Sequence, residues 1–157
     1  MKHFFSILFV AFALSITASA QETIDLQVNG VGVYTSYSTV VQKLGKPLSE
    51  KKGGEFPCGN DETLTLRYKG LIVRLIEAND GTGFIVGSVS ITSAKWSISG
   101  VNIGASIKDI QTRFGQSEVE TKESGLENLS YGMAEGFADF YFRNNKLVKV
   151  YWEFNIC

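Results

Sequence analysis

Acidic side chains are the first candidates for chemistry in this sequence, because two carboxylates a few ångströms apart can act together as general acid and base. Five of them fall in or beside segments with strand, turn or helix-start patterns: Asp25, Glu62, Asp109, Asp139 and Glu153. No spacing in the sequence selects a pair among them. A small hydrolase that uses a carboxylate pair is therefore one alternative, and the main expectation is a protein that is not an enzyme.

Histidine chemistry is confined to His3, which lies in a segment typical of a secretory signal peptide. The start MKH is positive, residues 4–16 are almost wholly apolar, and the small residues ASA end the segment at 18–20. The apolar run is shorter than the roughly 20 residues of a transmembrane helix. We expect cleavage after Ala20 and a soluble exported protein, in the periplasm or outside the cell. Without histidine, the mature chain is expected to need no metal or other cofactor.

The two cysteines are Cys58, in a polar loop, and Cys157, the last residue of the sequence. In an exported chain an even number of cysteines favours a disulfide bond. Such a bond would close a loop of about 100 residues and contribute roughly 4–5 kcal/mol in the chain-entropy account. Two free thiols and a redox pair are the alternatives.

Basic and tyrosine side chains form a second candidate group, suited to binding rather than to catalysis. Tyrosine and arginine are enriched at interface hot spots because they combine a large contact area with a polar group. An ordinary solvated sheet face is the alternative interpretation. The residues expected to contact a partner are Arg67, Lys69, Arg74, Tyr141, Lys149 and Tyr151.

The charge balance excludes nucleic acid as an expected partner. The formal net charge is −1, and removal of Lys2 with the leader makes it −2. No basic stripe and no second long apolar run occur in the sequence. The expected partner is a protein or a component of the cell envelope.

Two similar segments, 29–45 and 99–115, indicate which elements position these side chains. They read NGVGVYTSYSTVVQKLG and SGVNIGASIKDIQTRFG. Alternating apolar residues before and within each segment predict a strand. A short helix is then expected to begin after Ser36 or Ser106, which are good N-cap residues, and to end at Gly45 or Gly115.

Three further strands are expected after each helix, joined by short turns that favour antiparallel pairing. The predicted ranges are 63–69, 71–76 and 84–92, and then 126–133, 137–143 and 146–154. The predicted fold class is α+β, with two tandem strand-helix-three-strand repeats whose short helices pack on one face of an antiparallel sheet. The repeats would span 21–93 and 94–157 as one continuous compact unit.

Alternation along the strands also predicts which side chains face the helices. The inward set in the second half is Ala138, Phe140, Phe142, Val148, Val150, Trp152 and Phe154. Leu64, Leu66 and Tyr68 are expected inside in the first half. Asp139, Tyr141, Lys149 and Tyr151 would then face away from the helices.

The two-copy layout resembles the β-lactamase-inhibitor-protein-like fold. The resemblance rests on the segments GVGVYTSYSTVVQKLGKP and GVNIGASIKDIQTRFG, which are each followed by strands that end in GSVSIT or KLVKVYW. The chain is also similar to small lipoproteins of the barrel-assembly machinery. In the inhibitor fold the helices cover the convex face of the sheet, and the concave face with an acidic hairpin turn grips the enzyme. The resemblance implies an exported, non-enzymatic binding domain, possible subtypes being a β-lactamase or protease inhibitor. A purely structural envelope protein is the remaining alternative.

Overall fold

The computed structural model describes residues 23–53, 62–78, 80–122 and 125–154. The expected signal peptide, Cys58 and Cys157 lie outside these residues. The signal peptide and the disulfide bond therefore stay predictions from the sequence.

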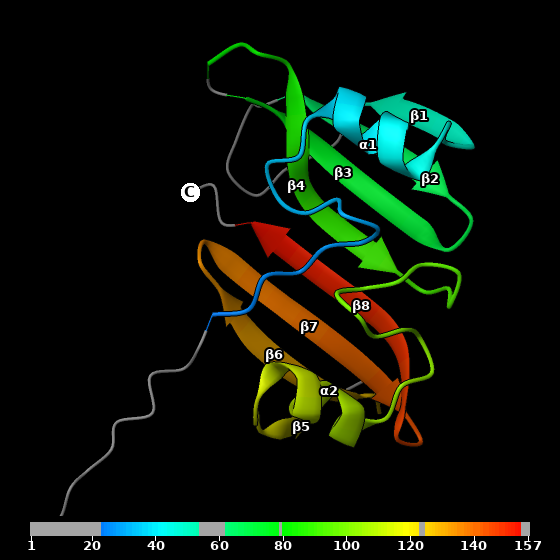
Figure 1. Cartoon of the computed structure of the whole chain (residues 1–157), viewed down its shortest axis with the longest axis vertical. Helices are drawn as coiled ribbons and strands as arrows, with labels where there is room; N and C mark the ends of the chain where they lie inside the picture. The colour runs from blue at the N-terminus through cyan, green and yellow to red at the C-terminus, as the bar shows by residue number, and fades with distance from the viewer. Residues whose placement is uncertain (1–22, 54–61, 79, 123–124, 155–157) are drawn as a thin grey trace, which may run out of the picture.

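One antiparallel sheet of eight strands organises the molecule, in the order β1-β2-β3-β4-β8-β7-β6-β5 (Figure 1). Strands β4 and β8 join its two sides through four residue pairs, from Ser88 opposite Glu153 to Ile91 opposite Val150. The strands are β1 Ser49–Lys52, β2 Thr63–Tyr68, β3 Leu71–Glu77, β4 Phe84–Ile91, β5 Val119–Thr121, β6 Glu127–Met133, β7 Gly136–Arg143 and β8 Lys146–Phe154.

The predicted fold class is wrong, because this single sheet dominates the structure and the strand-helix-three-strand unit does not occur. The two helices have only eight residues each, α1 Tyr37–Leu44 and α2 Ile107–Phe114. The segments before them form isolated bridges instead of strands, Val28 with Val31 and Ile98 with Val101.

A tight turn in each pre-helix segment explains this outcome. Asn29 and Gly30 both have positive φ, and so do Ser99 and Gly100. Such a turn folds the chain back on itself after one bridge, so no strand can extend into the sheet. The apolar residues on either side of the turns, such as Val28, Val31 and Ile98, are nevertheless buried. Their burial explains why the sequence alternates there as it does in a strand.

Strands β1 and β5 were not predicted, and both lie at the edges of the sheet. All their described side chains are exposed. A short polar edge strand has no buried face, and the hydrophobic alternation that reveals a strand in sequence is therefore missing.

Both helices and the chain segment 23–35 lie on the same side of the sheet (Figure 1). Ser106 begins α2 with a capping box, in which its hydroxyl accepts from the amide of Asp109 and the Asp109 carboxylate accepts from the amide of Ser106. Val40 of α1 and Ile110 of α2 are fully buried toward the core. Helices this short depend on such packing for their stability.

The core fills the space between the sheet and this helix side. Its largest fully buried side chains are Trp152, Phe140 and Phe142. The inward prediction is correct for these three, but Val148 is only half-buried and Leu147 takes its place in the core. A register shift between Tyr141 and Phe142 pairs Phe142 with Leu147, so that at the start of β8 Leu147 faces the core in place of Val148.

Candidate binding face of the sheet

The side of the sheet away from the helices, here called the open face, carries two polar rows that cross the strands. In one row Arg74 lies opposite Ser88, which pairs with Glu153 of β8. In the other row Ser90 pairs with Tyr151, and Tyr151 pairs with Asp139. The open face comprises Lys51, Thr65, Arg67, Ile72, Arg74, Ser88, Ser90, Asn128, Ser130, Phe137, Asp139, Tyr141, Lys149, Tyr151 and Glu153.

Lys149 lies between two tyrosines on this face. Its Nζ atom is 5.1 Å from the ring centroid of Tyr141 and 5.6 Å from that of Tyr151. Tyr141 is the cross-strand partner of Lys149, and Tyr151 follows two residues later on the same face of β8. Each cation–π contact contributes about 0.5–1 kcal/mol at a partly exposed site. We call these three residues the aromatic clamp.

Carboxylates hold the hydroxyl groups of both tyrosines. The Tyr141 hydroxyl donates to Oδ2 of Asp139 at 3.1 Å, and the Tyr151 hydroxyl donates to Oε2 of Glu153. Burial, followed by the charge of Asp139 and its hydrogen bond, raises the pKa of Tyr141 to about 12. Burial and then the hydrogen bond to Glu153 raise the pKa of Tyr151. Both hydroxyls therefore stay protonated at neutral pH.

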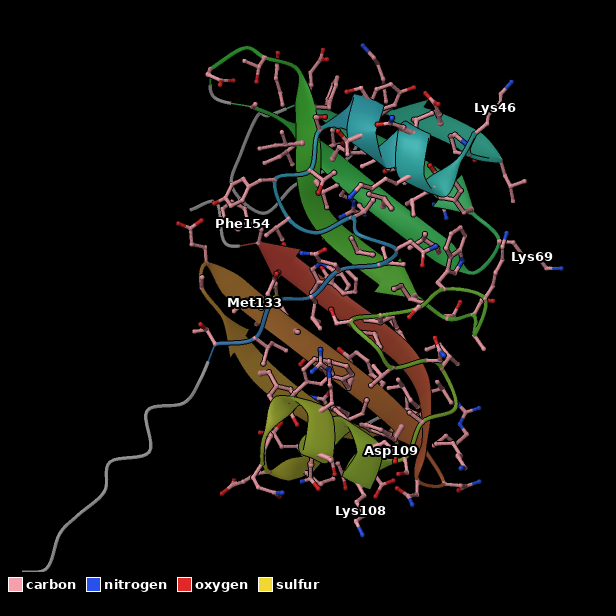
Figure 2. All side chains as sticks on the ribbon, in the orientation of Figure 1. Lys46, Lys69, Lys108, Asp109, Met133 and Phe154 are labelled. Atoms are coloured by element: carbon pink, nitrogen blue, oxygen red, sulfur yellow. The ribbon has the colours of Figure 1, made fainter. Side chains whose placement is uncertain are left out.

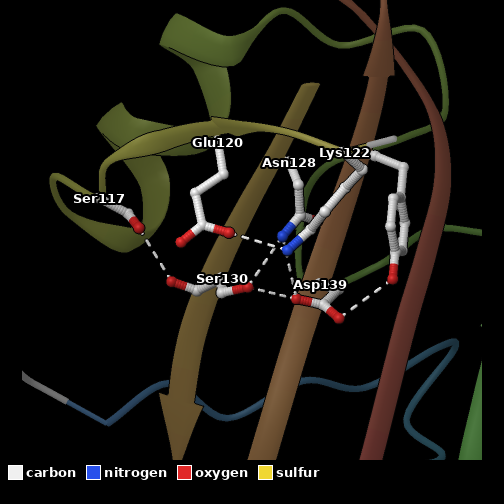
Figure 3. Close-up of polar contacts among 7 residues, drawn as sticks. Ser117, Glu120, Lys122, Asn128, Ser130 and Asp139 are labelled. Atoms are coloured by element: carbon white, nitrogen blue, oxygen red, sulfur yellow. Dashed lines mark hydrogen bonds and ion pairs between the residues drawn. The ribbon is translucent and has the colours of Figure 1, made fainter. Parts of the chain in front are cut away.

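Asp139 is also the centre of a polar network on β6 and β7 (Figure 3). Its Oδ1 atom accepts from the Ser130 hydroxyl and, at 3.3 Å, from the amide nitrogen of Asn128. Asn128 is fully buried, and its Oδ1 atom has no hydrogen-bond partner among the described residues. Beside the network, Lys122 pairs with Glu120 at 2.8 Å. The network fixes the carboxylate that holds Tyr141.

Four of the six predicted partner-binding residues come together around this site: Arg74, Tyr141, Lys149 and Tyr151. Arg67 is on the same face, but it is exposed on β2, opposite Ile72. Lys69 lies in the turn after β2 and extends away from the sheet (Figure 2).

Sequence reasoning missed the supporting residues Asn128 and Ser130. They occupy alternate positions on β6, and Ser130 lies directly opposite Asp139. Period-two spacing places them on one face, but their pairing with Asp139 depends on the strand register, for which the sequence has no local signal.

The candidate carboxylates for catalysis are dispersed. Asp109 caps α2, where the amide and hydroxyl of Ser106 hold its pKa below the usual value. Oε2 of Glu62 lies 4.0 Å from Nζ of Lys52, which makes a long ion pair. Only Asp139 and Glu153 are brought near one another, at diagonal positions on β7 and β8. Among the described residues, no three His, Cys, Asp or Glu side chains are grouped so that they could hold a metal ion.

Two hollows border segment 23–35. One, of about 180 Å³, is mainly apolar and is lined in part by Ile24, Met133 and Phe154. The other, of about 630 Å³, is polar and is lined in part by Asp25 and Arg113. Neither is lined by a residue of the aromatic clamp.

Comparison with known proteins gives information about the fold alone. No protein family and no curated protein sequence matches the chain. A solved extracellular protein with an SCP domain from Bacillus anthracis str. Ames matches with a TM-score of 0.52 and 13% identity, over 92% of this chain and 50% of that one. This chain therefore spans about half the length of that protein.

A DUF4309 family protein from Bacillus subtilis subsp. subtilis str. 168 matches with a TM-score of 0.42 and 16% identity, over 77% of this chain and 79% of that one. Neither structure is a β-lactamase inhibitor protein, so that resemblance is not confirmed. Among the residues that the structure describes, no helix is long and apolar enough to cross a membrane.

Proposed function

We propose that this protein is an exported, non-enzymatic binding domain that holds a protein partner on the open face of its sheet. The observation that carries the proposal is the aromatic clamp, in which Lys149 lies between Tyr141 and Tyr151. Among the described residues, both helices and segment 23–35 lie on the opposite side of the sheet, and an antiparallel sheet can offer its second face to a partner.

The clamp differs from an ordinary solvated surface in its degree of order. Each tyrosine ring is fixed at its hydroxyl by a carboxylate and at its face by Lys149. Side chains that are already ordered lose less conformational entropy when a partner binds. Phe137 is 42% exposed, and its ring centroid lies 6.1 Å from that of Tyr151, so it extends the apolar contact area.

Export rests on the leader-like pattern of residues 1–20. The structurally similar protein from Bacillus anthracis is an extracellular protein. An exported location would place the open face among proteins and other components of the cell envelope or the medium.

Cross-linking of the exported protein in native envelope extract, followed by mass spectrometry, tests the proposal. The wild type is compared with Tyr141→Ala and with Tyr151→Ala. Lys108→Ala, on the exposed surface of α2, is the matched control. We expect a specific adduct with the wild type and the control, and its loss in both tyrosine variants. An adduct that survives both tyrosine changes contradicts the proposed face.

A carboxylate-dependent hydrolase is the second candidate, since the register brings Asp139 and Glu153 to diagonal positions. Both carboxylates accept hydrogen bonds from tyrosine hydroxyls, which occupy lone pairs that a general base would offer to a substrate. A broad hydrolase screen at several pH values, with Asp139→Asn as control, decides between the two. Activity that disappears in Asp139→Asn would favour the enzyme.

Enzyme inhibition is a narrower form of the same binding function. The turn between β2 and β3 reads Tyr68-Lys69-Gly70-Leu71. It has a lysine at the place where the β-lactamase inhibitor proteins have an acidic residue. Assays of β-lactamases and proteases with the pure protein test this subtype directly, and failure to inhibit any of them removes it.

A further inference from the structure

We infer that the partner presents an acidic, extended protein segment to the open face. This inference rests on the proposed function and adds the chemistry of the partner. It starts from the cations of the face: Arg67, Arg74 and Lys149, with Lys51 on the edge strand β1. Among the described residues, no carboxylate lies within ion-pair distance of any of these four.

Each carboxylate of the same face already has a polar partner, and Glu120, opposite Asn128 on β5, forms an ion pair with Lys122. Asp139 accepts hydrogen bonds from Tyr141, Ser130 and Asn128. Glu153 accepts from Tyr151. The hydrogen-bonding capacity that remains free on the open face therefore belongs mainly to donors with positive charge.

The sign of this face also differs from that of the whole chain. Among the described residues, its four cations have no ion-pair partner, and Asp139 and Glu153 are the carboxylates without one, because Glu120 pairs with Lys122. The formal net charge of the chain, by contrast, is −1. A face of one sign on a chain of the opposite net sign favours a complementary partner surface. The complementary surface here is acidic.

The spacing of the cations suits an extended chain. Arg67 lies in the same cross-strand row as Tyr151, three strands away. Neighbouring strands are about 4.8 Å apart, which puts roughly 14 Å between these two positions. At about 3.3 Å per residue, an extended segment covers that distance in four to five residues. Acidic residues at that interval reach Arg67 at one end and, at the other, Lys149, whose Nζ atom is 5.6 Å from the Tyr151 ring. An apolar residue of the same segment then contacts Tyr151 or Phe137.

Three synthetic peptides test the inference by isothermal titration calorimetry with the full-length exported protein. The first has nine residues, with glutamate at positions 1, 5 and 9, phenylalanine at positions 3 and 7, and serine between them, so that glutamate and phenylalanine share one face of the extended chain. The other two peptides replace glutamate by glutamine or by lysine. We expect the glutamate peptide to bind about tenfold more tightly than the glutamine peptide at low salt, since two exposed ion pairs supply roughly that factor. Added salt should remove the advantage.

Variants of the cations then locate the effect. Arg74→Gln with Lys149→Gln should abolish the preference for glutamate, and Arg74→Glu with Lys149→Glu should reverse it toward the lysine peptide. Lys108→Gln on α2 is the control and should leave the preference unchanged. The milder glutamine pair keeps the test valid if the reversed pair fails to fold, as judged by circular dichroism.

A preference for the glutamine or lysine peptide in the wild type overturns the inference, as does a glutamate preference that survives both double variants. Binding of phosphatidylglycerol vesicles through Arg74 and Lys149, with no binding of the glutamate peptide, also overturns it in favour of a lipid surface. These results leave the proposed function standing if the tyrosine variants still lose the cross-linked partner. The proposed function itself fails if the cross-linked adduct does not depend on the two tyrosines.

Discussion

Replacing Tyr141 by phenylalanine should remove one hydrogen bond from Asp139 while the ring stays beside Lys149. At neutral pH we expect the loss of about 1.5 kcal/mol from the free energy of unfolding, the lower end of the roughly 1.5–3 kcal/mol that a hydrogen bond to a charged group contributes. The bond that is lost joins the Tyr141 hydroxyl to Oδ2 of Asp139. Asp139 keeps its bonds from Ser130 and Asn128, which limits the cost.

The same tyrosine should make stability depend on alkaline pH. In the folded protein the pKa of Tyr141 is raised to about 12, whereas its ordinary value is 10.0. Because the folded state holds this proton more tightly, its contribution is complete below pH 10 and is lost as the pH rises from about 10 to about 12. Two pH units correspond to about 2.7 kcal/mol, which we reduce to about 1–2 kcal/mol because the side chain is partly exposed.

Urea unfolding at half-unit steps between pH 9 and pH 12 measures this effect as the difference between wild type and Tyr141→Phe. The wild type should lose its advantage over this range, since the variant has no proton to lose at position 141. Subtracting the variant cancels the titration of the other tyrosines. A stability difference that stays constant between pH 9 and pH 12 would refute the bond between Tyr141 and Asp139.

Three further experiments test other features of the fold. Gly136→Ala should cost more than about 2 kcal/mol, because its Cβ would clash with a backbone carbonyl of β8, whereas Gly132→Ala meets open space and should cost less than about 1 kcal/mol in urea unfolding. Ser106→Ala should cost about 1 kcal/mol through loss of the capping box, and more than the same change at the N-cap of α1, which lacks one. Non-reducing peptide mapping should find Cys58 bonded to Cys157, and reduction should then lower the melting temperature; two free thiols would contradict that expectation.

Strands with one buried face could be predicted closely from the sequence. The ranges expected for β2, β3, β4, β6, β7 and β8 differ from those observed by at most one residue at either end. Alternating apolar residues and short turns fix these hairpins locally. The N-cap serines and terminal glycines of both helices were likewise correct, because capping depends on residues close in sequence.

Features that depend on distant partners could not be predicted. The pre-helix segments alternate as strands do, yet tight turns prevent them from joining the sheet. Leu147 replaces Val148 in the core because of a register shift that no local pattern announces. The candidate face could be anticipated from outward arginine and tyrosine positions, but the bonds that fix the clamp through Asp139 arise only when β6, β7 and β8 pair.

Site-specific photo-cross-linking tests the central claim most directly. A photoreactive amino acid is placed at Ser90, which pairs with Tyr151 on the open face, and in a second protein at Lys46, which lies on the helix side. In native envelope extract we predict a partner adduct from position 90 and none from position 46. An adduct from position 46 with none from position 90 would contradict the assignment of the open face as the binding surface.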